Sequence, residues 1–347
     1  MNAHIHQAPQ TSARITTSEF CVDAALERVE HFMRELARRG GLDRTAEMAA
    51  DQLSTGGKRV RARLALASAR AFGVAEEHAV AWAACVELLH NATLVHDDIQ
   101  DGDTTRRGKP TIWAKYGAAQ AINAGDFLLM LPFLCLSDLP APARGELSTL
   151  VAEYATRIVR GQADELSQEV DGSTTVQQYI RAVEGKTGAL LALPVVGAAV
   201  LAGRCPRDAE RVGAPFVQLG VLFQLQDDLI DMFGDKGRGT IGGDVYEGKN
   251  SALLVTLCAH AAEAGRTVSE IVRRPRSSTS LTDIERVREI YETHHVVELV
   301  VGRILQIRDQ VLGSTLLIQE PQLHSLAGLL VQIALAPLQH LIEETFE

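Results

Sequence analysis

Apolar residues recur at intervals of three and four positions along almost the whole chain, and strict alternation of apolar and polar residues is rare. This spacing predicts α-helices rather than β-strands. Residues 79–95, 213–226 and 326–342 are apolar on nearly every side. Such segments are typical of helices that are buried among other helices. The pattern therefore predicts an all-α protein.

Polar signals mark where some of these helices begin and end. Thr16 and Ser280 precede amphipathic segments and are predicted N-caps. Residues 273–280, "RRPRSSTS", are predicted to form a loop. Residues 1–15 lack an apolar pattern, and their composition predicts disorder. No linker divides the remainder, so we expect one domain that covers residues 16–347.

Composition narrows the functional classes. A net charge of −10 argues against nucleic acid or an anionic membrane as a partner. The N-terminus lacks the apolar region of a signal peptide, and the apolar run 188–203 is short and interrupted, which predicts a buried helix rather than a membrane span. Without a CxxC pair, the five cysteines are expected to be reduced core residues of a cytoplasmic protein: Cys21, Cys85, Cys135, Cys205 and Cys258.

The sequence DDxxD occurs twice, each time at the end of an apolar helical segment. The first copy lies in "LVHDDIQD" and the second in "FQLQDDLID". Their acidic residues are Asp97, Asp98 and Asp101 in the first motif, and Asp227, Asp228 and Asp231 in the second. Residues at i and i+4 share a helix face, where like charges repel, and a helix C-terminus disfavours acids. Two such arrangements make sense if a cation binds there.

Magnesium is the metal that fits these acids best. Mg²⁺ is usually held by one or two carboxylates together with substrate phosphates. Zn²⁺ fits poorly because no His or Cys ligands flank the motifs. A single DDxxD is more often a solvated acidic helix end, but the second copy favours metal binding around a diphosphate.

Basic residues beside glycines complete the pattern. Arginine matches phosphate oxygens bidentately and lysine acts as a point charge. Each cluster alone would be ordinary surface charge, but together they accompany the acids: Lys58, Arg59, Arg61, Arg106, Arg107, Lys186 and Lys249. His90 lies two helical turns before Asp97 on the same predicted helix. A lone histidine there is usually a core residue, although it can donate to a nearby phosphate.

Taken together, these motifs resemble those of the trans-isoprenyl diphosphate synthases, or polyprenyl synthetases. The resemblance runs from about Thr55 to Leu254 and includes "GGKR", "LLHNATLVHDDIQD", "RRGKPT", "GDFLL", "KTG", "FQLQDDLID" and "GDVYEGK". It implies the isoprenoid synthase fold, a single-domain bundle of many antiparallel helices around a deep central cavity, usually as a homodimer. It also implies condensation of isopentenyl diphosphate with an allylic diphosphate such as dimethylallyl, geranyl or farnesyl diphosphate.

The resemblance further implies a role for each matching residue. The acids of both motifs would coordinate Mg²⁺, three ions per active site, with Asp97, Asp101 and Asp227 as catalytic ligands alongside Arg106 and Lys186. The allylic diphosphate would be held by five residues: Arg106, Lys186, Thr187, Gln224 and Lys249. Isopentenyl diphosphate would be held by four: Lys58, Arg61, His90 and Arg107.

The chain departs from the family pattern at two places. Ala62 stands where the family usually has proline, and we expect little effect. Gly239 falls about where the family has a lysine between the second motif and the EGK segment. Lys236 or Arg238 is a candidate replacement for this diphosphate contact.

Small residues above the first motif bear on product length. Early-stopping family members often carry an aromatic residue at the position of Ala92 or Thr93, or two extra residues inside the first motif, and neither device is present. The pocket is therefore expected to be open at this level, with a geranylgeranyl product. Six residues are candidates for its wall or floor, although a simple core role is equally expected for each: Trp82, Leu89, Ala92, Thr93, Phe127 and Met130.

Three alternative functions remain at this point. The first is a longer-chain synthase for quinone side chains. The second is a class I terpene cyclase, which normally pairs DDxxD with a mixed second motif and does not need the "GGKR" diphosphate site. The third is a non-catalytic prenyl-diphosphate-binding subunit, in which loss of aspartates would be expected. Both intact motifs favour a prenyltransferase.

Overall fold

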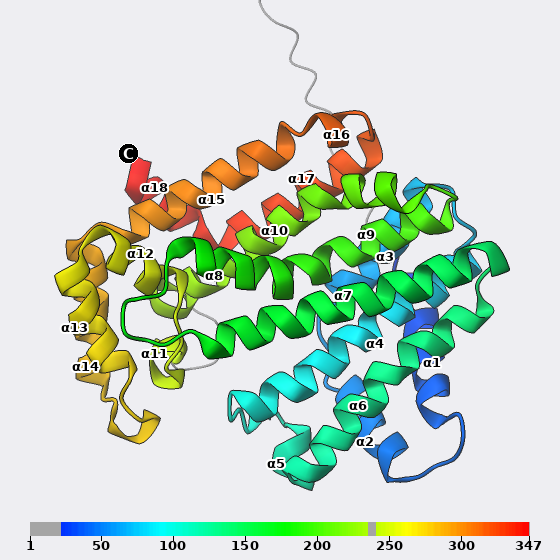
Figure 1. Cartoon of the computed structure of the whole chain (residues 1–347), viewed down its shortest axis with the longest axis horizontal. Helices are drawn as coiled ribbons and strands as arrows, with labels where there is room; N and C mark the ends of the chain where they lie inside the picture. Colours follow the sequence, from blue (N-terminus) through cyan, green and yellow to red (C-terminus); the bar gives the residue numbers. More distant parts are fainter. Residues whose placement is uncertain (1–21, 235–240, 347) are drawn as a thin grey trace, which may run out of the picture.

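Helices make up nearly all the regular structure of residues 22–234 and 241–346, which this computed structural model describes (Figure 1). The elements are α1 (Asp23–Arg38), α2 (Arg44–Leu53), α3 (Val60–Ala71), α4 (Glu76–Gln100), β1 (Thr105–Arg106), β2 (Lys109–Pro110), α5 (Ile112–Tyr116), α6 (Ala118–Cys135), η2 (Leu136–Asp138), α7 (Ala141–Ser167), α8 (Val176–Val183), η3 (Glu184–Gly188), α9 (Ala189–Leu201), α10 (Pro206–Phe233), α11 (Gly243–Glu247), α12 (Ala252–His260), α13 (Ala262–Val272), η4 (Arg276–Ser278), α14 (Leu281–Thr293), α15 (Val296–Leu312), α16 (Thr315–Ile318), α17 (Pro321–Leu335), η5 (Ala336–Leu338) and α18 (Gln339–Phe346). The prediction of an all-α fold is confirmed.

The most apolar helices form the centre of the molecule. Helix α4 packs against α3, α6 and α9, and α10 packs against α9, α15 and α17. Their all-round apolar composition explains this placement, because every face meets another helix. One continuous core runs from Val22 to Leu341, which agrees with a single domain. The predicted disorder of residues 1–15 and the predicted cap at Thr16 lie outside the described residues.

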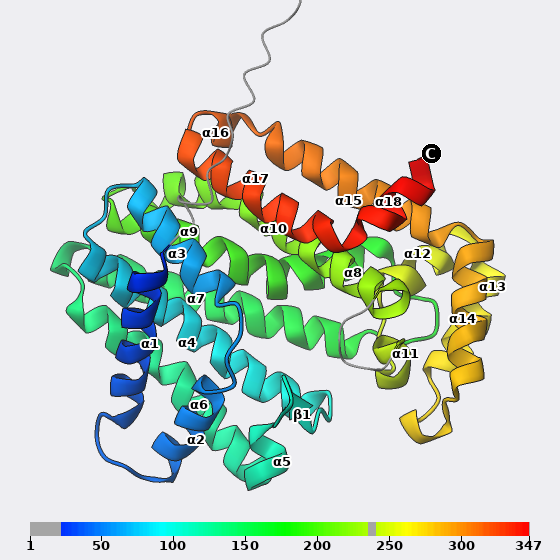
Figure 2. The ribbon, with the colours of Figure 1, turned by 180° about the vertical axis from the view of Figure 1, so that it is seen from behind.

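The two ends of the bundle carry the shorter helices. Figure 1 shows α13 and α14 beside α11 at one end, and α1 and α2 near the other. The reverse view in Figure 2 shows the hairpin that contains β1 projecting beyond the end of α4, close to α5. This hairpin pairs Thr105 with Pro110 and Arg106 with Lys109, and the helical pattern gave no sign of it.

The predicted helix cap at Ser280, the predicted loop and the predicted buried helix are all present. Ser280 caps α14 in a capping box with Asp283, as its position predicts. Residues 273–280 form a loop that contains the short 3₁₀ turn η4. The predicted buried helix is α9, which packs against α3, α7 and α10. Three segments are nevertheless long and apolar enough to cross a membrane by length and composition, namely Ala118–Asp138, Val176–Leu201 and Pro321–Glu344, and 78% of the most apolar window of Val176–Leu201 is buried.

The cysteines follow the prediction only in part. Cys85 and Cys135 are free and buried, and Cys258 is free and half-buried. Cys205 is free but exposed, because it caps α10 at the surface rather than facing the core. Cys21 lies outside the described residues.

Candidate active site

The two acidic motifs end long central helices, and two lysines from other segments approach the first motif. Asp97 lies in the last turn of α4, and Asp101 is the residue that caps this helix. The Lys186 Nζ of η3 lies 4.0 Å from Asp97 Oδ2. The Lys249 Nζ, just beyond α11, lies 3.0 Å from Asp101 Oδ2. Segments that are far apart in sequence therefore converge on the first motif, as the motifs predict.

Burial leaves these carboxylates short of compensating charge. Burial raises the pKa of Asp97 to about 6, against the pull of Lys186. Lys186 also contacts Glu165 at 3.0 Å, so its charge is shared. Burial tends to lower the pKa of Lys249, but Asp101 and Glu247 outweigh it, and the pKa of Lys249 lies above its ordinary value. The site therefore holds more buried negative charge than the two lysines neutralise fully.

Asp98 has a different role from the other acids of its motif. It is 1% exposed, and its Oδ1 accepts hydrogen bonds from Arg106 Nε at 2.7 Å and contacts Arg106 Nη2 at 2.6 Å. Its Oδ2 is buried without a hydrogen-bond partner. Asp98 thus anchors Arg106 beside the first motif, and its expected place among the exposed metal ligands is not supported by this geometry.

Asp228 of the second motif is buried and accepts three hydrogen bonds that hold it in place. Its Oδ2 accepts from the Tyr179 hydroxyl at 2.7 Å and from the Ala252 backbone N–H at 2.6 Å, and its Oδ1 accepts from Gln224 at 2.9 Å. Burial raises the pKa of Asp228 to about 6, although these donors oppose the shift. Gln224 in turn accepts from the Thr187 hydroxyl at 3.1 Å. Asp228 is therefore held in place by the segment that also carries Lys186.

The other two acids of the second motif differ in exposure. Asp227 is exposed on α10, and Asp231, one turn later, is buried. Asp231 Oδ2 accepts from the Asp244 backbone N–H at 2.9 Å, which ties α10 to the start of α11. Asp227 is thus the acid of this motif that a ligand in solvent reaches most easily.

The donor set suits a hard divalent cation that arrives with phosphate. Among residues 22–234 and 241–346, no three His, Cys, Asp or Glu side chains are grouped to hold a metal ion without help. Mg²⁺ does not need such a cage, because it keeps waters and takes phosphate oxygens as ligands. The excess of buried negative charge around Asp97 and Asp101 matches the charge of a dication. The residues present therefore fit Mg²⁺ bound together with a diphosphate.

A second cationic group forms between α3 and α4. Arg61 Nη1 lies 3.1 Å from His90 Nε2, so arginine donates and the imidazole accepts. Burial first and Arg61 second lower the pKa of His90 well below its ordinary value, so the ring is neutral and carries its proton on Nδ1. Both His90 Nδ1 and Arg61 Nε are buried without a partner. These two unused donors suit an anion such as a phosphate oxygen.

Arg107 joins this group through the β1–β2 hairpin. Its Nη1 donates to the Gly56 carbonyl, and its φ of 53° lies in the left-handed region. A Cβ at Gly57 would lie 2.3 Å from Arg107 Nη1, so a side chain there would displace the guanidinium, and the φ of 125° at Gly57 itself favours glycine. Lys58 follows at once and is exposed. The hairpin thus places Arg107 against the "GGKR" turn that also carries Lys58.

The same turn depends on a buried ion pair that sequence reasoning missed. Arg59, counted above with the phosphate-binding cations, is buried and donates to Glu87 at 3.1 Å and to the Leu53 carbonyl at 2.7 Å. The Ala62 N–H also donates to Glu87, at 3.3 Å, which a proline at that position could not do. A lone Glu in the apolar run of α4 was the available signal, because buried charges are normally paired.

The candidate chain-length residues separate into two groups. Leu89 and Ala92 are each 1% exposed on α4, and Thr93 and Phe127 are half-buried. Trp82 is fully buried, and its indole N–H donates to the Pro194 carbonyl of α9 at 3.0 Å. Met130 is 54% exposed on the outer face of α6, so it does not close an internal cavity of a single chain. Lys236 and Arg238 lie outside the described residues.

Comparison with known proteins places these features in a family. A sequence model described as polyprenyl synthetase matches residues 43–293. The (2E,6E)-farnesyl diphosphate synthase of Mycobacterium tuberculosis is 34% identical over 243 residues, covering 68% of this chain and 67% of the relative. The all-trans-nonaprenyl-diphosphate synthase of Rhodobacter capsulatus is 32% identical, covering 69% of this chain and 73% of the relative.

A solved structure agrees in fold over nearly the whole length. The geranylgeranyl pyrophosphate synthetase of the archaeon Geoglobus acetivorans superposes with a TM-score of 0.76 at 27% identity, covering 90% of this chain and 99% of that one. The family match, the relatives and the shared fold all agree with the motifs described above. The chain therefore belongs to the polyprenyl synthetase family, and it is a trans-prenyltransferase.

Proposed function

We propose that this protein condenses isopentenyl diphosphate with allylic diphosphates and releases geranylgeranyl diphosphate. The observation that carries this proposal is the presence of two separate anion sites. One lies at the acidic motifs with Lys186 and Lys249. The other is the Arg61–His90 pair with its unused donors. Two diphosphate substrates need two such sites, whereas a cyclase with one substrate needs only one.

The allylic diphosphate would bind at the acidic motifs. Asp97, Asp101 and Asp227 would hold Mg²⁺, which when bound neutralises the leaving diphosphate as its C–O bond ionises. In this structure, Lys186 lies near Asp97 and Lys249 contacts Asp101. We expect both ammonium groups to shift to phosphate oxygens when the substrate binds. Cations placed where negative charge develops stabilise the transition state more than the ground state.

Isopentenyl diphosphate would bind at the second site. The neutral His90 offers its Nδ1–H, and Arg61 offers its Nε–H, as donors to one diphosphate group. This fixes the position of the substrate double bond relative to the allylic carbon. The apolar side chains of α4 near Leu89 and Ala92 keep water away from the carbocation.

Small residues of α4 before Asp97 bear on product length. Ala92 and Thr93 leave no bulky side chain directly above Asp97, which supports a product longer than farnesyl. The relatives include enzymes for farnesyl and nonaprenyl products, so length must be measured. The test is to incubate the protein with Mg²⁺, labelled isopentenyl diphosphate and each allylic primer in turn, and to size the products. A dominant C20 product supports the proposal, and products that end at C15 or pass well beyond C20 refute it.

We also propose that the active unit is a homodimer formed through α6. Four large apolar side chains of this helix are exposed, namely Ile122, Met130, Phe133 and Leu134. Exposed apolar faces of this kind commonly mark protein interfaces. Light scattering should give twice the chain mass for the wild type and a monomer for Met130→Glu, and a monomeric wild type would refute the assignment.

A further inference from the structure

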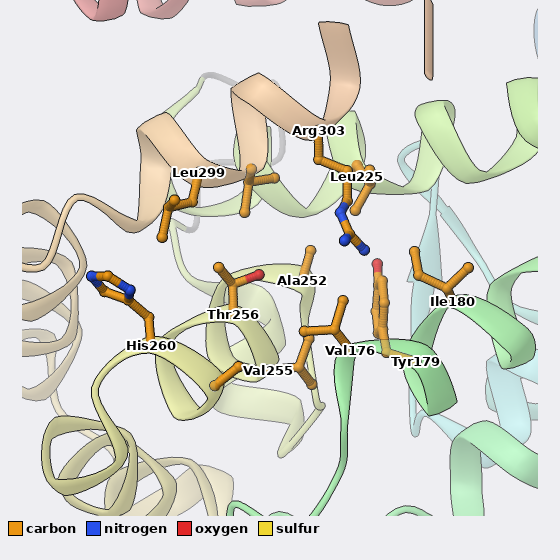
Figure 3. Close-up of a pocket in the computed structure, with 12 residues that line it drawn as sticks. Val176, Tyr179, Ile180, Leu225, Ala252, Val255, Thr256, His260, Leu299 and Arg303 are labelled. Carbon is orange, nitrogen blue, oxygen red and sulfur yellow. The ribbon is translucent and has the colours of Figure 1, made fainter. Parts of the chain in front are cut away.

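A separate cavity of about 280 Å³ lies between α8, α10, α12 and α15 (Figure 3). Its inner wall consists of buried or half-buried residues: Val176, Tyr179, Ile180, Leu225, Ala252, Val255 and Val300. None of the residues assigned above to the two diphosphate sites lines it. The cavity is therefore distinct from the active site, although both lie beside α10.

The mouth of the cavity is polar and carries positive charge. Arg303 of α15 and His260 of α12 are exposed at the rim, with Thr256 between them and the apolar wall. In Figure 3 the Arg303 side chain extends from α15 in the direction of Tyr179. None of the lining residues is acidic. Within residues 22–234 and 241–346, Arg303 makes no ion pair or hydrogen bond with another side chain.

An unpaired arginine above an apolar floor selects for one kind of ligand. The guanidinium suits a carboxylate or phosphate group, which it can bind bidentately. The apolar wall gains from burying a short hydrocarbon tail, and the cavity is near the lower end of the size range of small-molecule sites. A free inorganic anion would not use the wall, and a neutral hydrocarbon would not use Arg303.

The inner wall of this cavity is also the support of the second acidic motif. The Tyr179 hydroxyl and the Ala252 backbone N–H, both from lining residues, donate to the same Asp228 oxygen, at 2.7 Å and 2.6 Å. Leu225 lies one turn before Asp228 on α10. An occupant that displaces Tyr179 or α12 by a small distance therefore changes the hydrogen bonds that hold Asp228.

We propose that this cavity binds a small amphiphilic anion, with its charged group on Arg303 and its apolar tail against Leu225 and Val255, and that its occupancy is transmitted through Tyr179 to Asp228. The proposal goes beyond the prenyltransferase reaction. Its binding test does not require turnover, so it can fail while the proposed function stands.

The test uses the full-length protein and hexyl phosphate as the probe. Calorimetric titrations are run with Mg²⁺ and inorganic diphosphate at saturating concentration, so that the diphosphate sites are already filled. We expect one molecule of hexyl phosphate to bind, and inorganic phosphate and 1-hexanol to bind more weakly. Lack of saturable binding to the wild type under these conditions overturns the proposal.

Three variants locate the bound probe. Arg303→Gln removes the charge at the rim and should weaken binding by about tenfold, as expected for loss of a charge-assisted hydrogen bond. Ala259 of α12 is exposed and lines the cavity next to His260, so Ala259→Trp should fill the mouth and abolish binding. The matched control is Arg308→Gln, because Arg308 is on the same helix but pairs with Asp309 outside the cavity. If Arg303→Gln binds the probe as tightly as Arg308→Gln and the wild type do, the probe does not bind in this cavity and the proposal is wrong.

A second measurement tests whether binding in the cavity affects the acidic motif that contains Asp228. Hexyl phosphate should change the affinity of the protein for Mg²⁺ with diphosphate, and by linkage these ligands should change the affinity for hexyl phosphate by the same factor. Arg303→Gln should lose this coupling while its thermal unfolding stays like that of the wild type. Equal affinities for Mg²⁺ and diphosphate with and without the probe overturn the link to Asp228.

Discussion

Replacement of Glu87 by glutamine tests how the "GGKR" turn is held in place. The Glu87 carboxylate is buried and accepts hydrogen bonds from Arg59 Nη1 at 3.1 Å and from the Ala62 N–H at 3.3 Å. Glu87→Gln has almost the same shape and keeps one acceptor oxygen, so it removes mainly the charge. Arg59 is then left buried with Glu30, at 3.3 Å, as its remaining acidic partner.

The size of the effect follows from this geometry. Removing one partner of a buried ion pair typically costs about 3–5 kcal/mol, and the contact with Glu30 retains part of this, so we expect about 3 kcal/mol. An unfolding entropy of about 2.1 cal/mol/K per residue gives roughly 0.7 kcal/mol/K for 347 residues. The melting temperature should therefore fall by about 4 °C for a two-state transition.

Glu87→Gln should weaken the binding of isopentenyl diphosphate but not that of the allylic substrate. A loosened turn displaces Lys58 and Arg61, so the KM for isopentenyl diphosphate should rise by about tenfold while the KM for the allylic substrate stays the same. Calorimetry and steady-state kinetics measure the two effects, with Glu289→Gln, an exposed glutamate on α14, as the matched control. A melting temperature equal to that of the control, or equal changes in both KM values, would refute this reasoning.

Three further predictions follow from the site. The pKa of His90 is held well below its usual value near 6.5, so the unfolded chain takes up a proton that folded His90 refuses, and stability falls as pH drops below about 6.5. Urea titrations should show that His90→Gln loses about 1.4 kcal/mol less than the wild type between pH 7.5 and 5.5, and equal losses would contradict the neutral ring. Ala92→Phe adds an aromatic ring to α4 five residues before Asp97 and should shorten the main product by at least one C5 unit in chromatographic sizing, whereas an unchanged length would remove Ala92 from the pocket wall. Lys249→Gln leaves Asp101 without its 3.0 Å partner and should lower kcat/KM for the allylic substrate by about tenfold or more, and an unchanged value would show that Lys249 does not contact that diphosphate.

Much of the fold was predictable because the helical pattern is strong and continuous. The buried helices α4, α9 and α10 follow directly from apolar residues on every face. The cap at Ser280 follows from its own side-chain chemistry. The β1–β2 hairpin was not predicted, because four paired residues leave no periodicity and the turn depends on left-handed backbone at Arg107.

The sequence predicted which residues form the site, but not which of its acids face a ligand and which are held inside the fold. Spacing predicted Asp97 and Asp101 on one helix face. The family resemblance, not spacing, grouped Lys186 and Lys249 with these acids, and both lysines lie close to them.

The family resemblance set Asp97, Asp101 and Asp227 apart as catalytic ligands. It still counted Asp98 and Asp228 among the metal ligands, whereas both point into the fold. That difference depends on partners far away in sequence, such as Tyr179, which lies 49 residues from Asp228.

Exposure was the other property that sequence did not determine. Met130 and Trp82 looked equally suited to closing the product pocket, because both are large and apolar. Trp82 is locked against α9, and Met130 faces outward from α6. Which face of an all-apolar helix meets the interior depends on its packing partners, and a single sequence does not state these.

The central claim is that the two acidic motifs act together on an allylic diphosphate. The most direct measurement compares Asp227→Asn with Asp208→Asn, an exposed aspartate near the start of the same helix α10. Both variants are assayed for incorporation of labelled isopentenyl diphosphate with farnesyl diphosphate and Mg²⁺. We predict that Asp227→Asn loses about a hundredfold or more in rate and Asp208→Asn retains wild-type activity. Equal activity of the two variants, or no incorporation by the wild type with any allylic primer, would contradict the account.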